Sequence, residues 1–364
     1  MLKSTYDLPM LPPPGELETP AVLRELASAH RPLAELKGRA ATIPNQGILI
    51  DTLALQEAKA SSEIENIVTT QDEIFQTNSF PDDPASPAAK EVASYRNALK
   101  CGYDSLLGHQ GLLTTNAIVE MFRTLKGTEE GFRTTPGTAL KSEATGALVY
   151  VPPQDGDEIV RHMRALERFI NDDEASSLDP LVKMALIHHQ FESIHPFSDG
   201  NGRIGRIINV LYLTRTGLLD IPILYLSRYI TSHKADYYRL LQAVRDDGVW
   251  EPWLLYMIRA VAETSRQTLE LIEGMRVMMA EYKQRLREHP SIRYSQDLLN
   301  NLFRHPYTRI EFLQTDLGVT RQTAARYLDQ LAAAGFVEKH QQWRNNYYVN
   351  TPLVALLMQA SGGR

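Results

Sequence analysis

Cysteine is almost absent from this 364-residue sequence, which contains only Cys101. One cysteine cannot form an intrachain disulfide, which excludes a small disulfide-stabilised scaffold and favours a reducing compartment. Positive charge is not in excess either, because 38 Lys and Arg residues stand against 44 Asp and Glu residues, a net charge of −6. We therefore do not expect a protein that coats nucleic acid or an anionic membrane with its whole surface.

Long apolar runs are missing as well. The most apolar stretch, residues 204–213, is interrupted by Arg206 and Asn209. It has about half the length that a membrane-spanning helix needs. The first ten residues contain no apolar segment typical of a signal peptide. We expect a soluble, cytoplasmic protein with no membrane contact.

What is present is the composition of a globular chain, with 43% hydrophobic and 23% charged residues. The length suits two or three packed units rather than one core. We predict a mainly α-helical fold with one β-hairpin and a C-terminal winged helix-turn-helix unit. The expected units are an N-terminal helical region, a catalytic core, a connecting helix and the C-terminal unit, at residues 1–90, 91–265, 266–290 and 291–364.

Three local patterns refine this helical prediction. The helix expected to begin at Pro20 should break or bend near Pro32, because proline removes a backbone donor. Residues 131–153 are rich in β-favouring Thr, Val and Tyr and are punctuated by glycine, which predicts a β-hairpin. Asp179 followed by Pro180 is typical of a helix start, with an N-cap and then proline at the first helical position.

Residues 291–350 have the pattern of a separate unit. A helix, a turn and a second helix are predicted over 311–333, and a two-stranded wing over 335–349. Arg321 and Arg326 lie on the would-be recognition helix. The positive charge of this unit is small for DNA binding, so contact with DNA and contact with protein, including dimerisation, both stay open.

The most informative run of the sequence is residues 195–206, which predicts an anion site. Gly200 and Gly202 let backbone N–H groups approach an anion closely, and the helix expected to open at Gly202 adds unpaired donors and a positive dipole end. Arg203 and Arg206 are three residues apart and therefore neighbours on that helix. Two guanidiniums in this arrangement suit a polyphosphate.

The same run also supplies an acid–base group and a metal ligand. Asp199 is the kind of lone carboxylate that a phosphate-bound Mg²⁺ takes from a protein. His195 is a base that titrates near neutral pH. Together with the anion site, these residues predict phosphoryl or nucleotidyl transfer.

The run resembles the signature of the Fic family, His-Pro-Phe-x-Asp-Gly-Asn-Gly-Arg-x-x-Arg, at all nine specified positions. The similarity extends over about residues 1–265. Members of that family mostly transfer AMP from ATP to a Ser, Thr or Tyr hydroxyl of a protein. The resemblance therefore implies a Mg²⁺-dependent protein adenylyltransferase, with ATP as co-substrate and a target protein docked on the 131–153 hairpin.

The resemblance also implies roles for single residues. His195 would deprotonate the target hydroxyl and Asp199 would hold Mg²⁺. Tyr238 lies where the family builds part of its adenine pocket, although aromatic core packing fits it equally well. The residues expected to bind ATP are Gly200, Asn201, Gly202, Arg203, Ile204, Gly205, Arg206 and Tyr238.

A second motif, Ser61-x-x-x-Glu65-Asn66, lies far upstream. Ser61 and Glu65 are four residues apart on one helix, so a local contact between them is the simplest interpretation. The segment also satisfies the inhibitory [Ser/Thr]-x-x-x-Glu-[Gly/Asn] pattern of Fic proteins. By that resemblance Glu65 would reach Arg206 and obstruct placement of the γ-phosphate, so that the enzyme inhibits itself.

Alternative functions remain at this level. A nucleotide-sensing transcriptional regulator or antitoxin-like module is one, and a hydrolase that removes AMP from modified proteins on the same fold is another. Donors other than ATP, such as UTP, also fit a motif that contacts phosphates rather than the base. The sequence does not identify the target protein, and it leaves self-modification and homodimerisation open.

Overall fold

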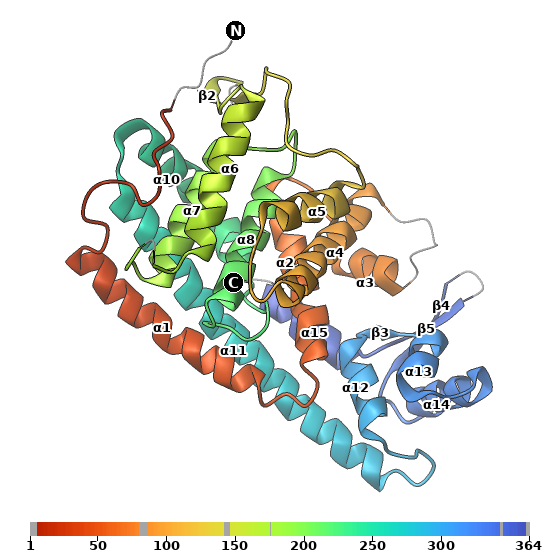
Figure 1. Ribbon diagram of the computed structural model, residues 1–364. Helices are drawn as coiled ribbons and strands as arrows, with labels where there is room; N and C mark the ends of the chain where they lie inside the picture. The colour runs from red at the N-terminus through yellow and green to blue at the C-terminus, as the bar shows by residue number, and fades with distance from the viewer. Residues whose placement is uncertain (1–5, 80–85, 142–145, 175, 343–344, 362–364) are drawn as a thin grey trace.

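The structure of the protein is a computed structural model that describes residues 6–79, 86–141, 146–174, 176–342 and 345–361 (Figure 1). It is mainly helical, as predicted. Ten helices and one strand pair precede the long helix α11. Their bounds are α1 (Pro20–Ala40), α2 (Gln46–Ile64), α3 (Gln71–Ser79), α4 (Pro87–Gly108), α5 (Thr115–Lys126), β1 (Leu140–Lys141), β2 (Leu148–Tyr150), α6 (Gly156–Asn171), α7 (Pro180–Ile194), α8 (Asn201–Arg215), α9 (Ser227–Ser232), α10 (Lys234–Asp247) and α11 (Trp250–Glu288).

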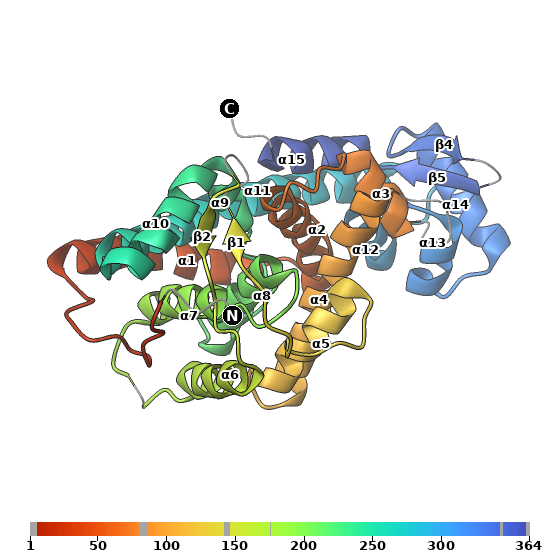
Figure 2. The ribbon, with the colours of Figure 1, turned by 90° about the horizontal axis from the view of Figure 1, so that it is seen from above.

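Two helices, α7 and α8, form the centre of this part of the molecule (Figures 1 and 2). Nearly all their residues are buried, so both are enclosed by other helices. The start of α7 is the predicted one: Asp179 accepts a hydrogen bond from the Leu181 N–H at 2.8 Å, and Pro180 is the first helical residue. The two helices pack against each other, which brings the end of α7 to the start of α8.

Of the two outcomes predicted at Pro32, the break is wrong, and the bend stays a prediction. Helix α1 runs without interruption through Pro32, which is buried. The buried face of α1, which includes Val22, Leu33 and Leu36, lies along α11 over much of its length (Figure 1). Packing along this whole face outweighs the one backbone hydrogen bond that proline removes.

The hairpin predicted over 131–153 is present but shorter. β1 and β2 pair antiparallel, with Leu140 opposite Tyr150, and the pairing shifts register between Leu140 and Lys141. Residues 142–145 at its tip, with the Thr145 expected in a strand, lie outside the described residues. The threonines at 134, 135 and 138 are not in a strand, because this segment is tied to the end of α7 instead of pairing across the hairpin.

The C-terminal part contains the helices and strands predicted for 311–349. Gly318 has φ 64° and provides the left-handed turn between α13 and α14. The three strands form one antiparallel sheet in the order β3-β5-β4, with His340 opposite Tyr347. The bounds are α12 (Gln296–Arg304), β3 (Tyr307–Thr308), α13 (Ile310–Leu317), α14 (Arg321–Ala333), β4 (Glu338–Gln342), β5 (Asn345–Val349) and α15 (Thr351–Ser361).

This C-terminal part packs against the remainder of the chain through α2, α3 and α11 (Figure 1). Arg304 Nε donates to Asp51 of α2 at 2.7 Å. The ring of Tyr307 stacks on Phe75 of α3 with centroids 5.1 Å apart. Tyr282 of α11 donates to the Phe336 carbonyl oxygen at 3.0 Å. Helix α11 therefore belongs to both parts of the molecule.

None of the helices in the described part of the chain has an apolar stretch long enough to cross a membrane.

Candidate active site

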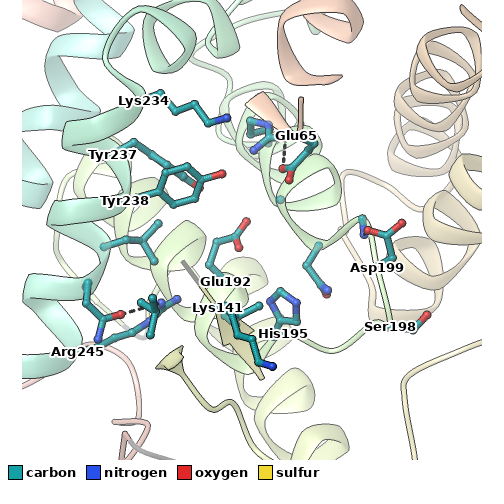
Figure 3. A pocket seen from close by; sticks show the side chains of 18 residues that line it. Glu65, Lys141, Glu192, His195, Ser198, Asp199, Lys234, Tyr237, Tyr238 and Arg245 are labelled. Carbon is teal, nitrogen blue, oxygen red and sulfur yellow. Dashed lines mark hydrogen bonds and ion pairs between the residues drawn. The ribbon is translucent and has the colours of Figure 1, made fainter. Parts of the chain in front are cut away.

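A cavity of about 570 Å³ lies where the ends of five elements meet, a size typical of small-molecule sites. These are the C-terminal end of α2, the hairpin, the end of α7, the start of α8, and α10 (Figure 3). Most of the predicted site residues line it. They are Glu65, His195, Asp199, Gly200, Asn201, Gly202, Arg206 and Tyr238.

His195 closes helix α7 and faces this cavity (Figure 3). Its backbone is left-handed, with φ 50°, which is unusual for a residue other than glycine and is typical of functional positions. Burial lowers the pKa of His195 to about 3, and the nearby Arg245 and Arg133 guanidiniums contribute to this lowering. The imidazole is therefore neutral at physiological pH, and the expectation that His195 titrates near neutral pH is wrong because the side chain is buried beside two guanidiniums.

The backbone around His195 is held by an arginine that the motifs of the sequence do not include. Arg133 Nε donates to the His195 carbonyl oxygen at 2.8 Å, and the Arg133 N–H donates to the Pro196 carbonyl oxygen at 2.9 Å. Tyr150 of β2 donates to the Ser193 carbonyl oxygen at 2.6 Å. The hairpin segment therefore fixes the end of α7 as well as covering the site.

Asn201 fixes the turn that connects His195 to α8. Its side-chain oxygen accepts from the Phe197 N–H and its side-chain nitrogen donates to the Phe197 carbonyl oxygen, both at 2.9 Å. Phe197 is fully buried and stacks on Phe122 with centroids 4.0 Å apart, as expected of a core anchor. The Asn201 amide was expected to bind ATP, but its hydrogen bonds here are to the protein backbone.

The N-terminus of α8 has no side-chain cap. Gly200 is the N-cap residue and has φ 77°, which only glycine adopts without strain. The first N–H groups of α8 are therefore free of a side-chain acceptor, as in helix termini that bind anions. At Gly202 a Cβ would overlap Glu65 Oε1 and lie 2.9 Å from Arg206 Nη1. The absence of a side chain thus lets Glu65 and Arg206 meet above this terminus.

Arg206 is fully buried, and three hydrogen bonds hold its guanidinium to the C-terminal end of α2. Nε donates to Ser61 Oγ at 2.8 Å, and Nη2 donates to the Ser61 carbonyl oxygen at 2.9 Å and to Glu65 Oε1 at 2.8 Å. Burial alone lowers the pKa of Arg206, but the Glu65 carboxylate outweighs it and the pKa is raised. Asn66, the third residue of the upstream motif, instead accepts a hydrogen bond from Lys234 at 2.9 Å.

The other two charged residues of the motif join a second network. Asp199 Oδ2 lies 2.6 Å from Lys126 Nζ and 3.5 Å from Arg203 Nη2. Arg203 is almost fully buried and pairs with Glu91 of α4. Burial raises the pKa of Asp199, but the Lys126 ammonium outweighs it and the pKa is lowered. Arg203 is not among the residues that line the cavity, and its contact with ATP stays a prediction.

Two further predicted ATP contacts, Ile204 and Gly205, also lie away from the cavity lining. Ile204 is fully buried in the core. A Cβ at Gly205 would lie 3.1 Å from Glu192 Oε1 and 3.2 Å from His188 Cε1, so this position faces α7. These residues shape the contact between α7 and α8. The expectation that they bind nucleotide followed from their place in the motif, and the cavity is formed without them.

One wall of the cavity is aromatic and comes from α10. Tyr237 is buried and bonded to His188 at 2.8 Å, whereas Tyr238 is 47% exposed and faces the opening (Figure 3). Burial lowers the pKa of His188 to about 3. His188 stacks on the fully buried Trp253 with centroids 6.0 Å apart. His188 is thus a core residue, whereas Tyr238 lies at the opening of the cavity.

Metal-binding side chains are sparse around the cavity. The described residues include no group of three or more His, Cys, Asp or Glu side chains arranged to hold a metal ion. Asp199 offers one partly exposed carboxylate at the cavity edge. A single carboxylate suits Mg²⁺ that arrives with phosphates and keeps most of its water, and does not suit an ion held by protein alone.

Three family models match the chain in succession. They are the Fic/DOC family N-terminal model at residues 23–104, the Fic/DOC family model at residues 112–213, and the C-terminal domain model of SoFic-like protein adenylyltransferases at residues 278–353. Together they span most of the chain.

Curated relatives named Protein adenylyltransferase Fic match part of the chain. The protein from Aedes aegypti is 27% identical over 198 residues, which are 54% of this chain and 37% of the relative. The protein from Drosophila ananassae is 33% identical over 122 residues, which are 34% of this chain and 22% of the relative. The matched region is thus about a fifth to a third of the length of these relatives.

Solved structures share the fold. The crystal structure of a Fic family protein from Desulfovibrio desulfuricans has a TM-score of 0.58 and 20% identity, and the match covers 93% of this chain and 98% of that one. A Fic domain containing signaling protein from Bacteroides thetaiotaomicron has a TM-score of 0.53 and 20% identity, and covers 70% of this chain and 97% of its own.

Proposed function

Because this chain belongs to the Fic/DOC family, we propose that it transfers AMP from ATP to a hydroxyl side chain of a target protein. One observation carries the proposal. A neutral histidine, an uncapped helix N-terminus and a buried arginine face the same cavity. The relatives of similar sequence are named protein adenylyltransferases.

In this mechanism the target hydroxyl oxygen attacks the α-phosphorus of ATP. A bond forms between them, the bond from the α-phosphorus to the bridging oxygen of the β-phosphate breaks, and pyrophosphate leaves. The neutral imidazole of His195 accepts the hydroxyl proton. Backbone N–H groups of Gly200–Gly202 and the Arg206 guanidinium hold the phosphates. Positioning of this kind supplies most of the catalysis in phosphoryl transfer.

Asp199 is the residue that would hold Mg²⁺ in this site. The metal would neutralise charge on the phosphates when it is bound with ATP. Lys126 and Arg203 occupy the Asp199 carboxylate here and keep it ionised, ready for a cation. Arg203 pairs with Glu91 and with Asp199, so it would position the Asp199 carboxylate. If a bound nucleotide draws the Arg203 guanidinium into the cavity, Arg203 would instead contact the nucleotide directly.

We further propose that the enzyme is inhibited by its own helix α2. Glu65 and Ser61 take the hydrogen-bonding positions of Arg206 that a γ-phosphate would otherwise use. Glu65 also lines the cavity, so its carboxylate would repel that phosphate. Withdrawal of Glu65 would release Arg206 to the nucleotide.

The remaining parts of the chain suggest how a target is presented. The hairpin, with Leu148 and Val149 exposed on β2, would pair with an extended segment of the target. The C-terminal elements α12 to β5 follow the order of a winged helix, and we propose that fold for them. Arg321 on α14 is 70% exposed but already pairs with Glu311, which favours contact with protein over contact with DNA.

The experiment compares wild type with Glu65→Gly and Glu65→Ala in Mg²⁺ and ATP labelled at the α-phosphate. Transfer is measured as the mass gain of one AMP on the chain itself and as label on proteins of a cell extract. Both variants are expected to transfer at least about ten times more AMP than wild type, because Arg206 is released. Glu65→Ala is the control for the extra backbone freedom that glycine brings at this helix end.

Two double variants distinguish the release of Arg206 from a nonspecific loss of rigidity in the protein. Glu65→Gly with His195→Ala and Glu65→Gly with Arg206→Ala should both be inactive. If Glu65→Gly adds no transfer, the inhibitory role of Glu65 is wrong. If it also abolishes removal of AMP from a modified protein, Glu65 is instead a catalytic residue of the reverse reaction.

A further inference from the structure

The proposed mechanism leaves one buried acidic side chain of the cavity without a role. Glu192 lies on α7, three residues before His195, and is 8% exposed. Its carboxyl group points into the middle of the cavity (Figure 3). Its Oε1 atom is buried and has no hydrogen-bond partner among the described residues. Oε1 lies against Gly205 of α8 and is closed off from the cavity, so a ligand there would reach the other oxygen of the Glu192 carboxyl group. Burial of a carboxyl group without a donor is costly, and a ligand can supply one.

The protein makes room for this group without satisfying it. Gly205 of α8 faces it, and a Cβ there would lie 3.1 Å from Glu192 Oε1. The nearby guanidiniums are engaged elsewhere. Arg206 is bonded to Ser61 and Glu65. Arg245 donates to Ser193 Oγ at 3.0 Å and lies over the Tyr150 ring at 4.0 Å.

The place of Glu192 between the two ends of the cavity identifies the chemistry of that ligand. The phosphate end is formed by Gly200–Gly202 and Arg206, and the aromatic end by Tyr238. In a nucleotide the ribose connects the base to the phosphates. A nucleotide that spans these two ends therefore has its ribose beside Glu192. The ribose carries two adjacent hydroxyl donors, and an acidic side chain commonly accepts from such hydroxyls in nucleotide-binding proteins.

We propose that Glu192 accepts hydrogen bonds from the ribose hydroxyls and makes the site selective for ribonucleotides over deoxyribonucleotides. This inference rests on the proposed function, because it requires a nucleoside triphosphate in the cavity. It assigns to α7 two adjacent tasks, ribose recognition at Glu192 and proton transfer one helical turn later at His195. It also explains why a glycine stands at position 205, because a side chain there would crowd the Glu192 carboxyl group.

The test measures equilibrium binding of ATP, 2′-deoxy-ATP and 3′-deoxy-ATP to the full chain by calorimetry, with Mg²⁺ present. Wild type is expected to bind ATP at least about tenfold more tightly than one of the two deoxynucleotides, because a hydrogen bond is lost and the buried Glu192 carboxyl group is left without a partner. Glu192→Ala should bind all three with nearly equal affinity. Glu192→Gln keeps the shape and one acceptor, and should show reduced selectivity even if the alanine variant folds poorly. Glu63→Gln, the same change at an exposed position of α2, should leave the selectivity of wild type unchanged.

The outcomes separate the two proposals. Equal affinity of wild type for ATP and both deoxynucleotides overturns the role of Glu192 but leaves the proposed function standing. A selectivity that persists unchanged in Glu192→Ala and Glu192→Gln also overturns the role of Glu192. Failure of wild type and of Glu65→Gly to bind any of the three nucleotides overturns both.

Discussion

At the scale of single residues, the site depends on charged groups that are buried with few partners. Arg206 is held by Ser61 and Glu65, and Arg203 pairs with Glu91. Glu192 differs because its Oε1 atom has no partner in the described part of the protein. Burial raises the pKa of Glu192 from its ordinary 4.5 to about 7, against the effect of Arg206. Such a shift has a consequence for stability that can be measured without any ligand.

We predict that the stability difference between wild type and Glu192→Gln depends on pH. Below pH 4.5 the carboxyl group is neutral in the folded and the unfolded state. Between pH 4.5 and 7 it is ionised only in the unfolded state, so rising pH destabilises the fold. Relative to Glu192→Gln, the free energy of unfolding of wild type should fall by about 3 kcal/mol over this window and then stay constant.

Denaturant unfolding at a series of pH values measures this difference. The buried His188, His189 and His195 also titrate on unfolding, but they are present in both proteins and cancel in the comparison. Parallel stability curves from pH 4.5 to 8 would contradict a buried, protonated Glu192.

The contact of Glu65 with Arg206, 141 residues apart, was expected from the family resemblance alone, whereas the residues that spacing revealed have partners near in the chain. The turn from His195 to α8 is local, so its glycines and Asp199 could be assigned from spacing. Arg133 and Glu91 were missed because their partners lie 62 and 112 residues away. Glu192 did carry a signal in the sequence. It is an acidic residue one helical turn before His195 on a helix that is otherwise almost entirely buried.

At the scale of elements, caps and periodicity located most helices. Asp179 and Pro180 begin α7, and Gly318 separates α13 from α14. The break wrongly predicted at Pro32 has a physical reason, since the sequence does not reveal that α1 packs along α11. The hairpin is shorter than predicted for a different physical reason. Residues expected in its first strand follow Arg133, which is bonded to the end of α7.

Helix α4 supplies a prediction about packing. Gly102 faces α5 and α8, and a Cβ there would overlap Met121 Sδ and lie 2.6 Å from Leu211 Cδ1. Gly102→Ala should therefore destabilise the fold by about 1–3 kcal/mol, although alanine is the better helix former. Thermal unfolding of the variant measures this effect.

A matched control lies in the same helix. A Cβ added at Gly108 would meet no atom of the described residues within 4 Å, so Gly108→Ala should be neutral or slightly stabilising. If both alanine variants have the stability of wild type, the close approach of α4 to α5 and α8 at Gly102 is wrong.

At the scale of the whole molecule, the C-terminal part is attached to the remainder of the chain, up to residue 290, through specific contacts. Arg304 pairs with Asp51 near the start of α2, the helix whose other end carries Glu65. Tyr282 of α11 lies edge-on to Phe303 and Phe336. The apolar surfaces on the two sides of residue 290 therefore cover each other, and the domain boundary expected there stays a prediction.

We predict that residues 1–290 fold without the C-terminal part but are less stable. The fragment keeps the packing of α1 along α11 and the central pair α7 and α8. It exposes apolar side chains at the end of α11, including Met279, Tyr282 and Leu286, and each costs about 1.5–3 kcal/mol when uncovered. We expect one cooperative thermal transition roughly 10 °C below that of the full chain.

The control for this truncation is Arg304→Ala in the full chain. That ion pair is partly exposed, so its loss should cost less than about 1 kcal/mol. If the fragment 1–290 shows no cooperative transition, these residues depend on the C-terminal part for folding.

The first turn of α11 also gives the protein an intrinsic optical signal. Trp253 is fully buried, donates to the Ala185 carbonyl oxygen at 2.9 Å and lies 5.8 Å from the Tyr237 ring, while Trp250 lies against His189. Indole emission from these positions reports on the core beneath the aromatic wall of the cavity. The fluorescence of the native chain should therefore change when a ligand covers Tyr238. In residues 1–290, which lack the third tryptophan, Trp343, the emission should follow the melting of the helical part alone.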